Sequence, residues 1–145
     1  MKRFSLALLS SLPFLFAGCS SMSGSSPQEI VASVAAANAG CTRLTLHCMQ
    51  DGAATCCAST DSARVGKASD AEDVKAMNTG ETVVKDENGG VDVTVPILMT
   101  DGKWTTVCGV TMAAGMEREK AIEAAKSIAM SVKTSLGDCC PNGCK

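Results

Sequence analysis

The stretch GGVDVTVPILMTDGKWTTVCGVTM, residues 89–112, decides the fold because it contains two β-strands joined by a tight turn. Valine recurs at every second position from Val91 to Val95, with Asp92 and Thr94 between. A period of two is typical of a strand with one buried face. The DGK sequence that follows is typical of a hairpin turn, so we expect the segments on either side of it to pair antiparallel.

Pro96 lies late in the first of these two strands. Proline has no backbone N–H to donate and is therefore rare in the interior of a sheet. We expect an edge, a bulge or a kink at this position.

Three further segments carry strand signals. The segment TRLTLHCMQ alternates, which places Leu44 and Cys48 on one face and Arg43 and His47 on the other. His47 is therefore expected to be a half-exposed strand residue that points away from Cys48. An Asp-Gly turn leads into a second strand, ATCCAST, and TVVKDENGG further along predicts another strand that ends in a turn.

Three helices are expected around these strands. The first has Ser26 as its N-cap and Glu29 as the partner that completes a capping box, and it ends at Gly40. The second is short, with a capping box formed by Ser69 and Glu72. The third, EREKAIEAAKSIAMSVKTSL, has apolar residues at helical spacing. The order predicts an α+β domain with one antiparallel sheet and helices on its faces.

The block from Val65 to Met112 resembles the extracytoplasmic PAS-like, or Cache-type, sensor domains. The segments GKASDAEDVKAMNTGE, GGVDVTVPIL and DGKWTTVCGVTM carry the resemblance through their turns and strand ends. It implies a PAS/Cache-like five-stranded antiparallel sheet flanked by N- and C-terminal helices. The sequence has no kinase, cyclase or chemotaxis segment, so a signal would pass to an envelope signalling partner.

The resemblance also implies a position for a ligand, because ligands of Cache-like domains lie against the sheet beneath the short helix and its loop. An arginine there would clamp a carboxylate, and a tryptophan would stack on an amine or a ring. The implied ligand is a small carboxylate or amine. The residues that map to this position are Arg64, Lys67, Asp92, Thr94, Trp104 and Thr106. An interaction domain whose pocket is filled by its own side chains is the alternative.

The beginning of the chain has the pattern of a secretory signal. Lys2 and Arg3 precede an apolar stretch of about thirteen residues, which is too short to span a bilayer as a helix. The sequence LFAGC is similar to a bacterial lipobox, although Phe16 stands where leucine is usual. We expect lipid on Cys19, and the absence of a following aspartate favours the outer membrane, facing the periplasm. An ordinary signal peptide that is cut after Ala17 or Gly18, with Cys19 left as a thiol, is the alternative.

The interpretation as a lipoprotein divides the chain into three parts. Residues 1–18 form the signal peptide, residues 19–26 a flexible Ser/Gly-rich tether, and residues 27–145 a single disulfide-rich domain. After removal of the signal peptide, Trp104 is the only aromatic residue left, so the core must be built from non-aromatic apolar side chains.

Cysteines are the most prominent chemical feature of the domain. Lipidation of Cys19 leaves eight of the nine cysteines, and an even number in an exported domain predicts up to four disulfides. They are Cys41, Cys48, Cys56, Cys57, Cys108, Cys139, Cys140 and Cys144. The first hairpin could bring Cys48 opposite Cys56 or Cys57, and Cys41 is one candidate partner for the tail cysteines. A soft-metal thiolate cluster or a thiol-redox function is the alternative.

Signatures of other functions are missing. The chain has one histidine, no G-x-S-x-G, no H-E-x-x-H and no phosphate-binding glycine loop. Loss of Lys2 and Arg3 reduces the 13 basic residues to 11, against 15 acidic ones. That balance, without a basic patch, argues against nucleic-acid binding. We expect a lipid-anchored, non-enzymatic sensory or small-molecule-binding module that has no cofactor and no metal.

Overall fold

The computed structural model describes residues 25–137 of the chain. The elements in this range are α1 (Pro27–Ala36), β1 (Cys41–Gln50), β2 (Ala53–Ser59), the 3-10 turn η1 (Ser62–Arg64), α2 (Ala71–Thr79), β3 (Val83–Glu87), β4 (Gly90–Thr100), β5 (Lys103–Met112) and α3 (Arg118–Leu136). The predicted signal peptide, Cys19 and the tail cysteines Cys139, Cys140 and Cys144 lie outside the described residues.

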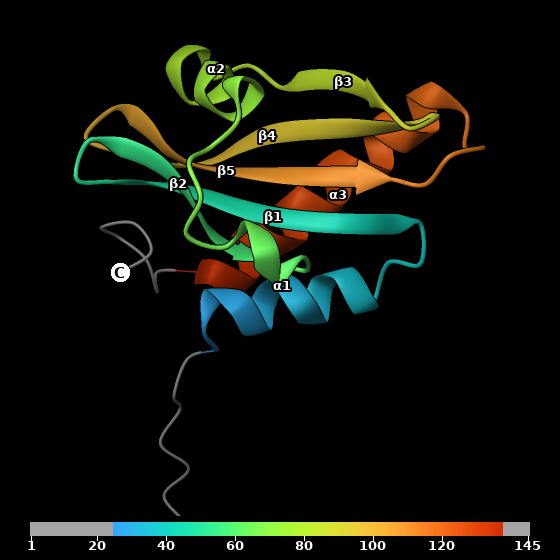
Figure 1. Cartoon of the computed structure of the whole chain (residues 1–145), viewed down its shortest axis with the longest axis horizontal. Coiled ribbons are helices and arrows are strands. Elements are labelled where there is room, and N and C mark those ends of the chain that lie inside the picture. Colours follow the sequence, from blue (N-terminus) through green and yellow to red (C-terminus); the bar gives the residue numbers. More distant parts are fainter. Residues whose placement is uncertain (1–24, 138–145) are drawn as a thin grey trace, which may run out of the picture.

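The five strands form one antiparallel sheet in the order β2-β1-β5-β4-β3 (Figure 1). The predicted five-stranded α+β fold is therefore confirmed. Three tight turns join neighbouring strands at Asp51-Gly52, Asn88-Gly89 and Asp101-Gly102, and both residues of each turn have positive φ. This conformation matches the right-handed twist of a hairpin, which explains why Asp-Gly and Asn-Gly occur there.

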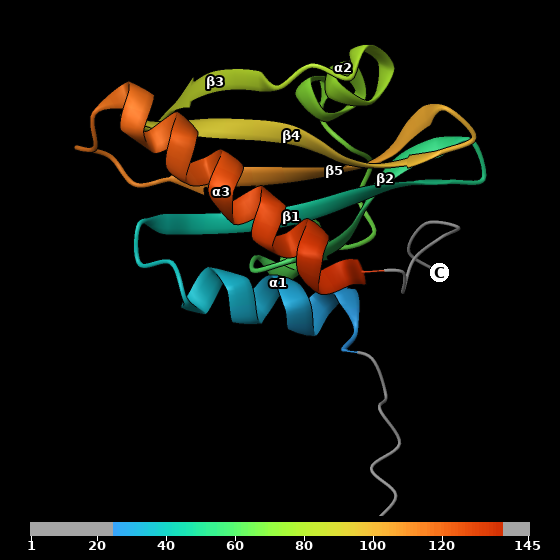
Figure 2. The ribbon, with the colours of Figure 1, turned by 180° about the vertical axis from the view of Figure 1, so that it is seen from behind.

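Helices α1 and α3 pack side by side on one face of the sheet (Figure 2). The alternating valines of β4 point to this side and join the main core. From α3 the core receives Ala121, Ala125, Ile128, Ala129, Val132 and Leu136. Ile122, which the spacing also assigned to the buried face, is only partly buried.

The opposite face of the sheet is covered only in part, by α2 and by the segment between β2 and α2 (Figure 1). This segment runs along β2 and protects its outer edge. The backbone N–H of Cys56 donates to the carbonyl of Lys67, and that of Ser69 donates to the carbonyl of Ala54. The middle of this face is not covered by any of the described helices (Figure 1).

Two helix boundaries differ from the expectation. The capping box at Ser26 and Glu29 is present, but α1 ends at Ala36 and not at Gly40. The side-chain amide of Asn38 donates to the Val34 carbonyl at 2.7 Å and so satisfies one of the last carbonyls of the helix. In α2 the box is formed one residue later than predicted, by Asp70 and Asp73.

Two bulges interrupt the pairing of β4 with β5. One lies between Pro96 and Leu98, as the proline predicted, and the other lies between the pairs Leu98–Thr106 and Met99–Trp104. Strand β3 reaches along β4 only as far as Thr94, so the edge of β4 beside Pro96 lacks a strand partner on that side. Each bulge shifts the alternation of side chains by one residue.

The five described cysteines divide between the two faces of the sheet. Cys48 and Cys108 lie in the main core beneath the helices, and Cys41 and Cys57 pack against it. Cys56 is directly opposite His47 and therefore lies on the other face.

Register and direction bear on the expected disulfide pairings. Cys48 lies opposite Thr55, so the first hairpin does not place it opposite Cys56 or Cys57 as expected. Cys41 begins β1 beside Met112, at the end of the sheet away from the last turn of α3 (Figure 2). The expected tail partners of Cys41, Cys139, Cys140 and Cys144, lie outside the described residues.

None of the helices in the described part of the chain is long and apolar enough to cross a membrane.

Candidate functional site

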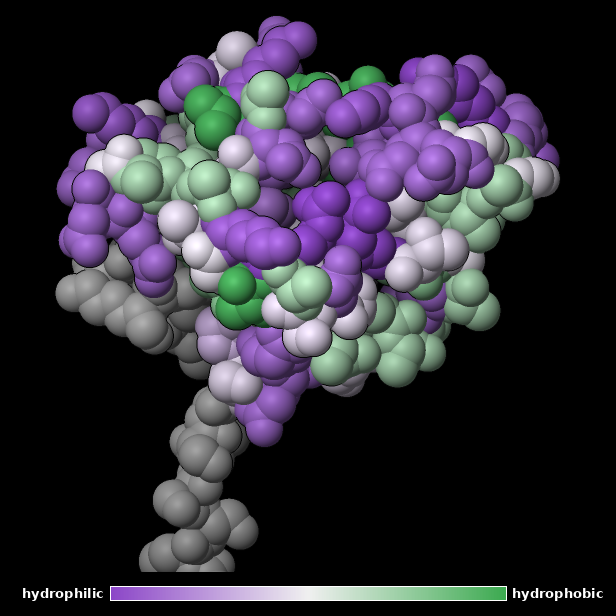
Figure 3. Space-filling model, in the orientation of Figure 1, coloured by the Kyte–Doolittle hydropathy of each residue, from purple (hydrophilic) through white to green (hydrophobic). Residues whose placement is uncertain are grey.

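A polar cavity of about 140 Å³ lies between α2, the segment that precedes it, and the open face of the sheet. Strands β1, β3 and β4 supply its floor and one wall. Figure 3 shows strongly hydrophilic side chains gathered around a hollow in the middle of this face. The residues that line it are Arg43, Thr45, His47, Arg64, Asp70, Glu72, Asp73, Lys85, Glu87 and Asp92.

The row formed by Arg43, Thr45 and His47 comes from the alternation of β1. These three residues occupy the polar positions of the strand, and the apolar residues that alternate with them face the helices. Gly109 of β5 is paired with Thr45, and a Cβ atom at Gly109 would lie 2.5 Å from the Thr45 hydroxyl oxygen. Glycine at this position therefore lets the polar row lie close to the sheet.

Arg43 is held at the centre of the open face by carboxylates. Its guanidinium donates to both carboxylate oxygens of Glu87, at 3.0 and 2.9 Å. Asp92 lies 3.8 Å from the same group and accepts from the Thr111 hydroxyl at 2.7 Å. The hydrogen bonds to Arg43 hold the pKa of Glu87 below its usual value. A guanidinium group held in this way is oriented to bind the carboxylate of a ligand, or to give up one of its own carboxylate partners to an amine.

His47 and Asp73 form a buried pair between β1 and α2. His47 Nδ1 lies 2.9 Å from the Ser69 hydroxyl and 3.3 Å from Asp73 Oδ2. Asp73 also accepts from the Asp70 backbone N–H at 3.0 Å and from the Thr94 hydroxyl at 3.3 Å. Asp73 therefore caps α2 and ties it to the sheet with the same carboxylate.

Burial determines the ionisation of this pair. Removal from water lowers the pKa of His47 despite the neighbouring Asp73 carboxylate, and it raises the pKa of Asp73. Because Ser69 and Asp73 contact the same ring nitrogen, the group does not have the arrangement of a catalytic triad, in which they bind opposite nitrogens. The arrangement holds α2 in place on the sheet.

The rim of the cavity carries two more ion pairs. Arg64 lies 3.3 Å from Asp70, and Lys85 lies 3.2 Å from Glu72. The lining thus contains five carboxyl groups and three permanently basic side chains. Since burial favours neutral His47, the surplus of carboxyl groups favours a ligand with a positive charge.

Arg43 and Glu87 also belong to a wider groove of about 460 Å³ at the end of β5. Thr42, Thr60, Asp61, Asn88 and the Thr111–Ala114 segment complete its walls. The two spaces share the Arg43–Glu87 pair as a common wall, and together they are in the range of small-molecule sites, about 300–1,000 Å³.

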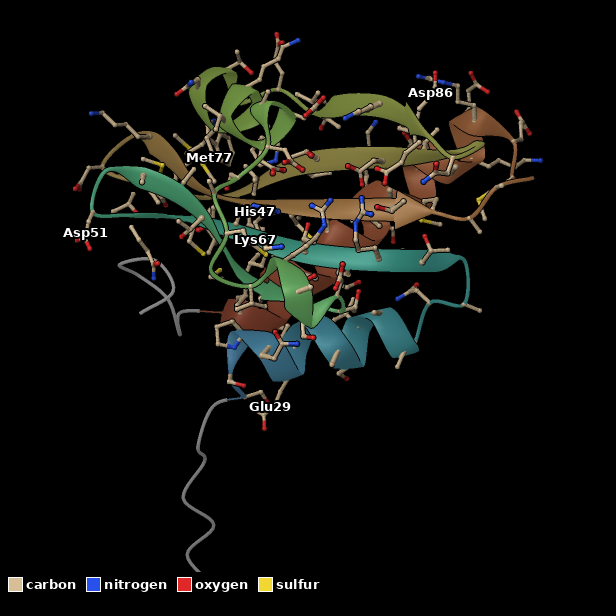
Figure 4. The ribbon with its side chains drawn as sticks, viewed as in Figure 1. Glu29, His47, Asp51, Lys67, Met77 and Asp86 are labelled. Carbon is tan, nitrogen blue, oxygen red and sulfur yellow. The ribbon has the colours of Figure 1, made fainter. Side chains whose placement is uncertain are left out.

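The six predicted ligand residues lie in different places. Arg64 and Asp92 line the polar cavity. Thr94 lies beneath it, buried, with its hydroxyl on Asp73. Lys67 is exposed and does not line the cavity, and Figure 4 shows it on the segment that passes His47.

The other two predicted residues are separated by a bulge. Trp104 lines a different cleft, near the ends of the hairpins. Thr106 lies opposite Cys48, which belongs to the helix-side core, and opposite Leu98, which packs against that core. Residues directly opposite each other share a face of the sheet, so Thr106 points away from the cavity. The interpretation that placed Trp104 and Thr106 together was wrong because the bulge between them reverses the alternation.

Three central residues were missed from the ligand site: Arg43, His47 and Asp73. The alternation of β1 placed Arg43 and His47 on the polar face, and that face is the one that carries the cavity. The expectation that His47 is half-exposed was wrong, since only 2% of it is accessible. Asp73 covers it, and the one-residue shift of the α2 capping box is what brings Asp73 there.

Within residues 25–137, no group of three His, Cys, Asp or Glu side chains is placed to hold a metal ion.

Comparisons with known proteins support the fold. No family model matches the sequence, and no curated protein matches it. The structure is similar to the GAF domain of a phosphoenolpyruvate-protein phosphotransferase from Acinetobacter, with a TM-score of 0.55 and 16% identity over 79% of this chain and 84% of that chain. The chain therefore has a GAF/PAS-like fold.

A second similarity is weaker. An IclR homolog from Microbacterium hydrocarbonoxydans, solved with 4-hydroxybenzoate, has a TM-score of 0.48 and 10% identity over 74% of this chain and 65% of that one. A similarity of this size carries no argument about function.

Proposed function

We propose that this chain is a non-catalytic, GAF/PAS-like binding module that takes a small amine-bearing molecule in the polar cavity. The observation that carries the proposal is the cavity itself, whose charged side chains come from β1, β3, β4, η1 and the start of α2. The surplus of carboxyl groups selects the amine over the carboxylate as the primary ligand. The GAF/PAS-like fold is compatible with this function but does not by itself establish it.

Binding would exchange one ion pair for another. An ammonium group close to Asp92 or Glu87 would compete with Arg43 for the carboxylates. The freed guanidinium could then bind an acidic group on the same ligand. The displacement of Arg43 would open the cavity toward the wider groove, which shares that residue.

Calorimetric titration of the exported domain with small primary amines, amino acids and carboxylates tests the proposal. An amine that binds should lose at least about tenfold in affinity with Asp92→Asn, because a partly buried charge contact is removed. Asp86→Asn is the matched control, since Asp86 lies on β3 outside the cavity with its side chain 77% exposed. The proposal fails if no amine binds, or if both variants bind as the wild type does.

We further propose that the module is tethered to the cell envelope through lipid on Cys19 and passes its signal to an envelope partner. The lipobox-like LFAGC sequence and the Ser/Gly-rich segment that follows it support this proposal. Labelled palmitate should be incorporated into the wild-type chain and into Cys41→Ser, but not into Cys19→Ser. Equal labelling of the Cys19→Ser variant would rule out the anchor.

A further inference from the structure

A second cleft, of about 620 Å³, lies at the end of the sheet where the two long hairpins turn. Met49 and Gly52 line it from the first hairpin, Met77 and Asn78 from α2, and residues 102–105 from the second hairpin. It shares no lining residue with the polar cavity. It is therefore a separate site with its own chemistry.

Trp104 reaches this cleft because of the bulge in β5. The shift between the pairs Leu98–Thr106 and Met99–Trp104 turns the indole to the side of the sheet that carries α2. There it lies against Gly80, where a Cβ atom would collide with the indole nitrogen. One part of the indole is thus fixed under the end of α2, and the residue is only partly buried.

Two methionine side chains line the cleft together with the indole. Met77 is 6% exposed and forms the wall on α2, as Figure 4 shows, whereas Met49 on β1 is 37% exposed. Met99, the register partner of Trp104, is 51% exposed. Thioether side chains are flexible and polarizable and adapt to flat ligands, which is why they recur at binding surfaces.

The polar groups of the cleft point to the charge of its ligand. Lys103 is the one charged side chain among the lining residues, and no carboxylate lines the cleft. Asn78 and Thr105 add neutral hydrogen-bonding groups. This is the reverse of the polar cavity, where carboxylates are in excess.

We propose that this cleft binds a small amphipathic molecule with a flat apolar ring, which stacks against Trp104 between Met49 and Met77, and with an anionic group that pairs with Lys103. The size of the cleft is in the range of small-molecule sites. This inference does not rest on the proposed function, because the two cavities have no residue in common.

The test uses two probes with the same rings and different charge, 1-anilinonaphthalene-8-sulfonate and N-phenyl-1-naphthylamine. Trp104 is the only tryptophan of the chain, so all tryptophan emission comes from this cleft. The domain of residues 20–145, which lacks Cys19, avoids interference from lipid. We expect the sulfonate to bind with one-to-one stoichiometry and to quench Trp104 by energy transfer.

Variants separate the two contacts. Lys103→Gln should weaken the sulfonate about fivefold and leave the uncharged amine unchanged. Met49→Ser should weaken both probes about fivefold through lost apolar contact. Met130→Ser is the control, since Met130 is 48% exposed on α3, away from the cleft.

Three results would overturn the proposal: no binding of the sulfonate, binding that leaves Trp104 emission unchanged, or equal effects of Met49→Ser and Met130→Ser. Equal binding of both probes to the wild type would reject the anionic group. Circular dichroism of each variant shows that the fold is retained, and Asp92→Asn, which acts on the polar cavity only, should leave both probes unaffected.

Discussion

His47 is the residue whose environment departs most from its sequence context. A lone histidine in an alternating strand is usually half-exposed, but Asp73 and Ser69 cover this one. No local pattern predicts the contact, because it joins residues 26 positions apart through the packing of α2 on the sheet. The polar row to which His47 belongs, in contrast, could be predicted from the alternation of β1 alone.

Protonation of His47 should destabilise the fold. Burial lowers its pKa below the unfolded value of 6.5, so the unfolded chain binds the proton more tightly. Stability is then lost as the pH falls below 6.5, toward the lower pKa of the folded state. Asp73 changes stability with pH in the opposite direction. Its pKa is raised in the folded state, so its contribution to the free energy of unfolding declines as the pH rises above 3.8.

Urea unfolding of the wild type and His47→Gln at pH 7 and pH 5 checks this prediction. The wild type should lose more free energy of unfolding between the two pH values than His47→Gln does. Because the chain has a single histidine, its NMR titration gives the folded pKa directly. Parallel losses in the two proteins, or a folded pKa above 6.5, would contradict the role assigned to burial.

Among the elements, α2 connects the two cavities. Its first turn carries Asp73 on the polar cavity, and its last turn carries Met77 on the Trp104 cleft. Gly80 ends the helix with φ of +72° and lies over the indole. A glycine at the end of a helix is predictable from sequence, but the tryptophan beneath it is not.

Gly80→Ala tests this contact, with Gly66→Ala as its control. Both glycines have positive φ, but a Cβ atom at Gly66 would meet nothing within 4 Å. The backbone strain is thus matched, and Gly80→Ala should cost about 1–3 kcal/mol more because it overpacks Trp104. Urea unfolding measures the difference, and Trp104 emission should shift in Gly80→Ala only.

Equal losses of stability in Gly80→Ala and Gly66→Ala, with unchanged emission, would show that the indole does not support the end of α2.

The strands show where prediction from sequence works and where it ends. All five strands were predicted from the sequence, two of them from alternation, and Asp-Gly turns predicted two of their connections. Alternation cannot show where an extra residue enters a strand, and one bulge is enough to reverse the faces of all residues beyond it. That is why Asp92 was correctly placed in the cavity while Thr106 was not.

At the scale of the whole molecule, the sheet separates a packed side from a side that carries cavities. The helix side is closed by α1 and α3, and the other side keeps the polar cavity and the Trp104 cleft. The same separation limits the disulfide framework, because cysteines on opposite faces cannot be joined.

No disulfide should join any two of Cys41, Cys56 and Cys108. Cys56 lies on the cavity side and the other two on the helix side. Cys41 is paired with Met112, four residues along β5 from Cys108, a separation of about 13 Å. A disulfide needs Cα atoms within about 7 Å.

Peptide mapping of the exported protein without reduction checks this expectation. Fragmentation that assigns each link to a single cysteine should show no link between any two of Cys41, Cys56 and Cys108. A link between Cys41 and Cys108 would contradict the register of β1 with β5, and a link to Cys56 would contradict its position on the cavity side. The predicted participation of Cys139, Cys140 and Cys144 in disulfides is read from the same map.

The central claim is that the open face of the sheet binds a small molecule, and NMR mapping tests it most directly. Backbone amide shifts of the exported domain would be followed during titration with the amine that binds best in calorimetry. The account predicts that the largest shifts cluster at Arg43–His47, Asp70–Asp73 and Asp92. Shifts confined to other surfaces, or no shifts with any amine, would contradict it.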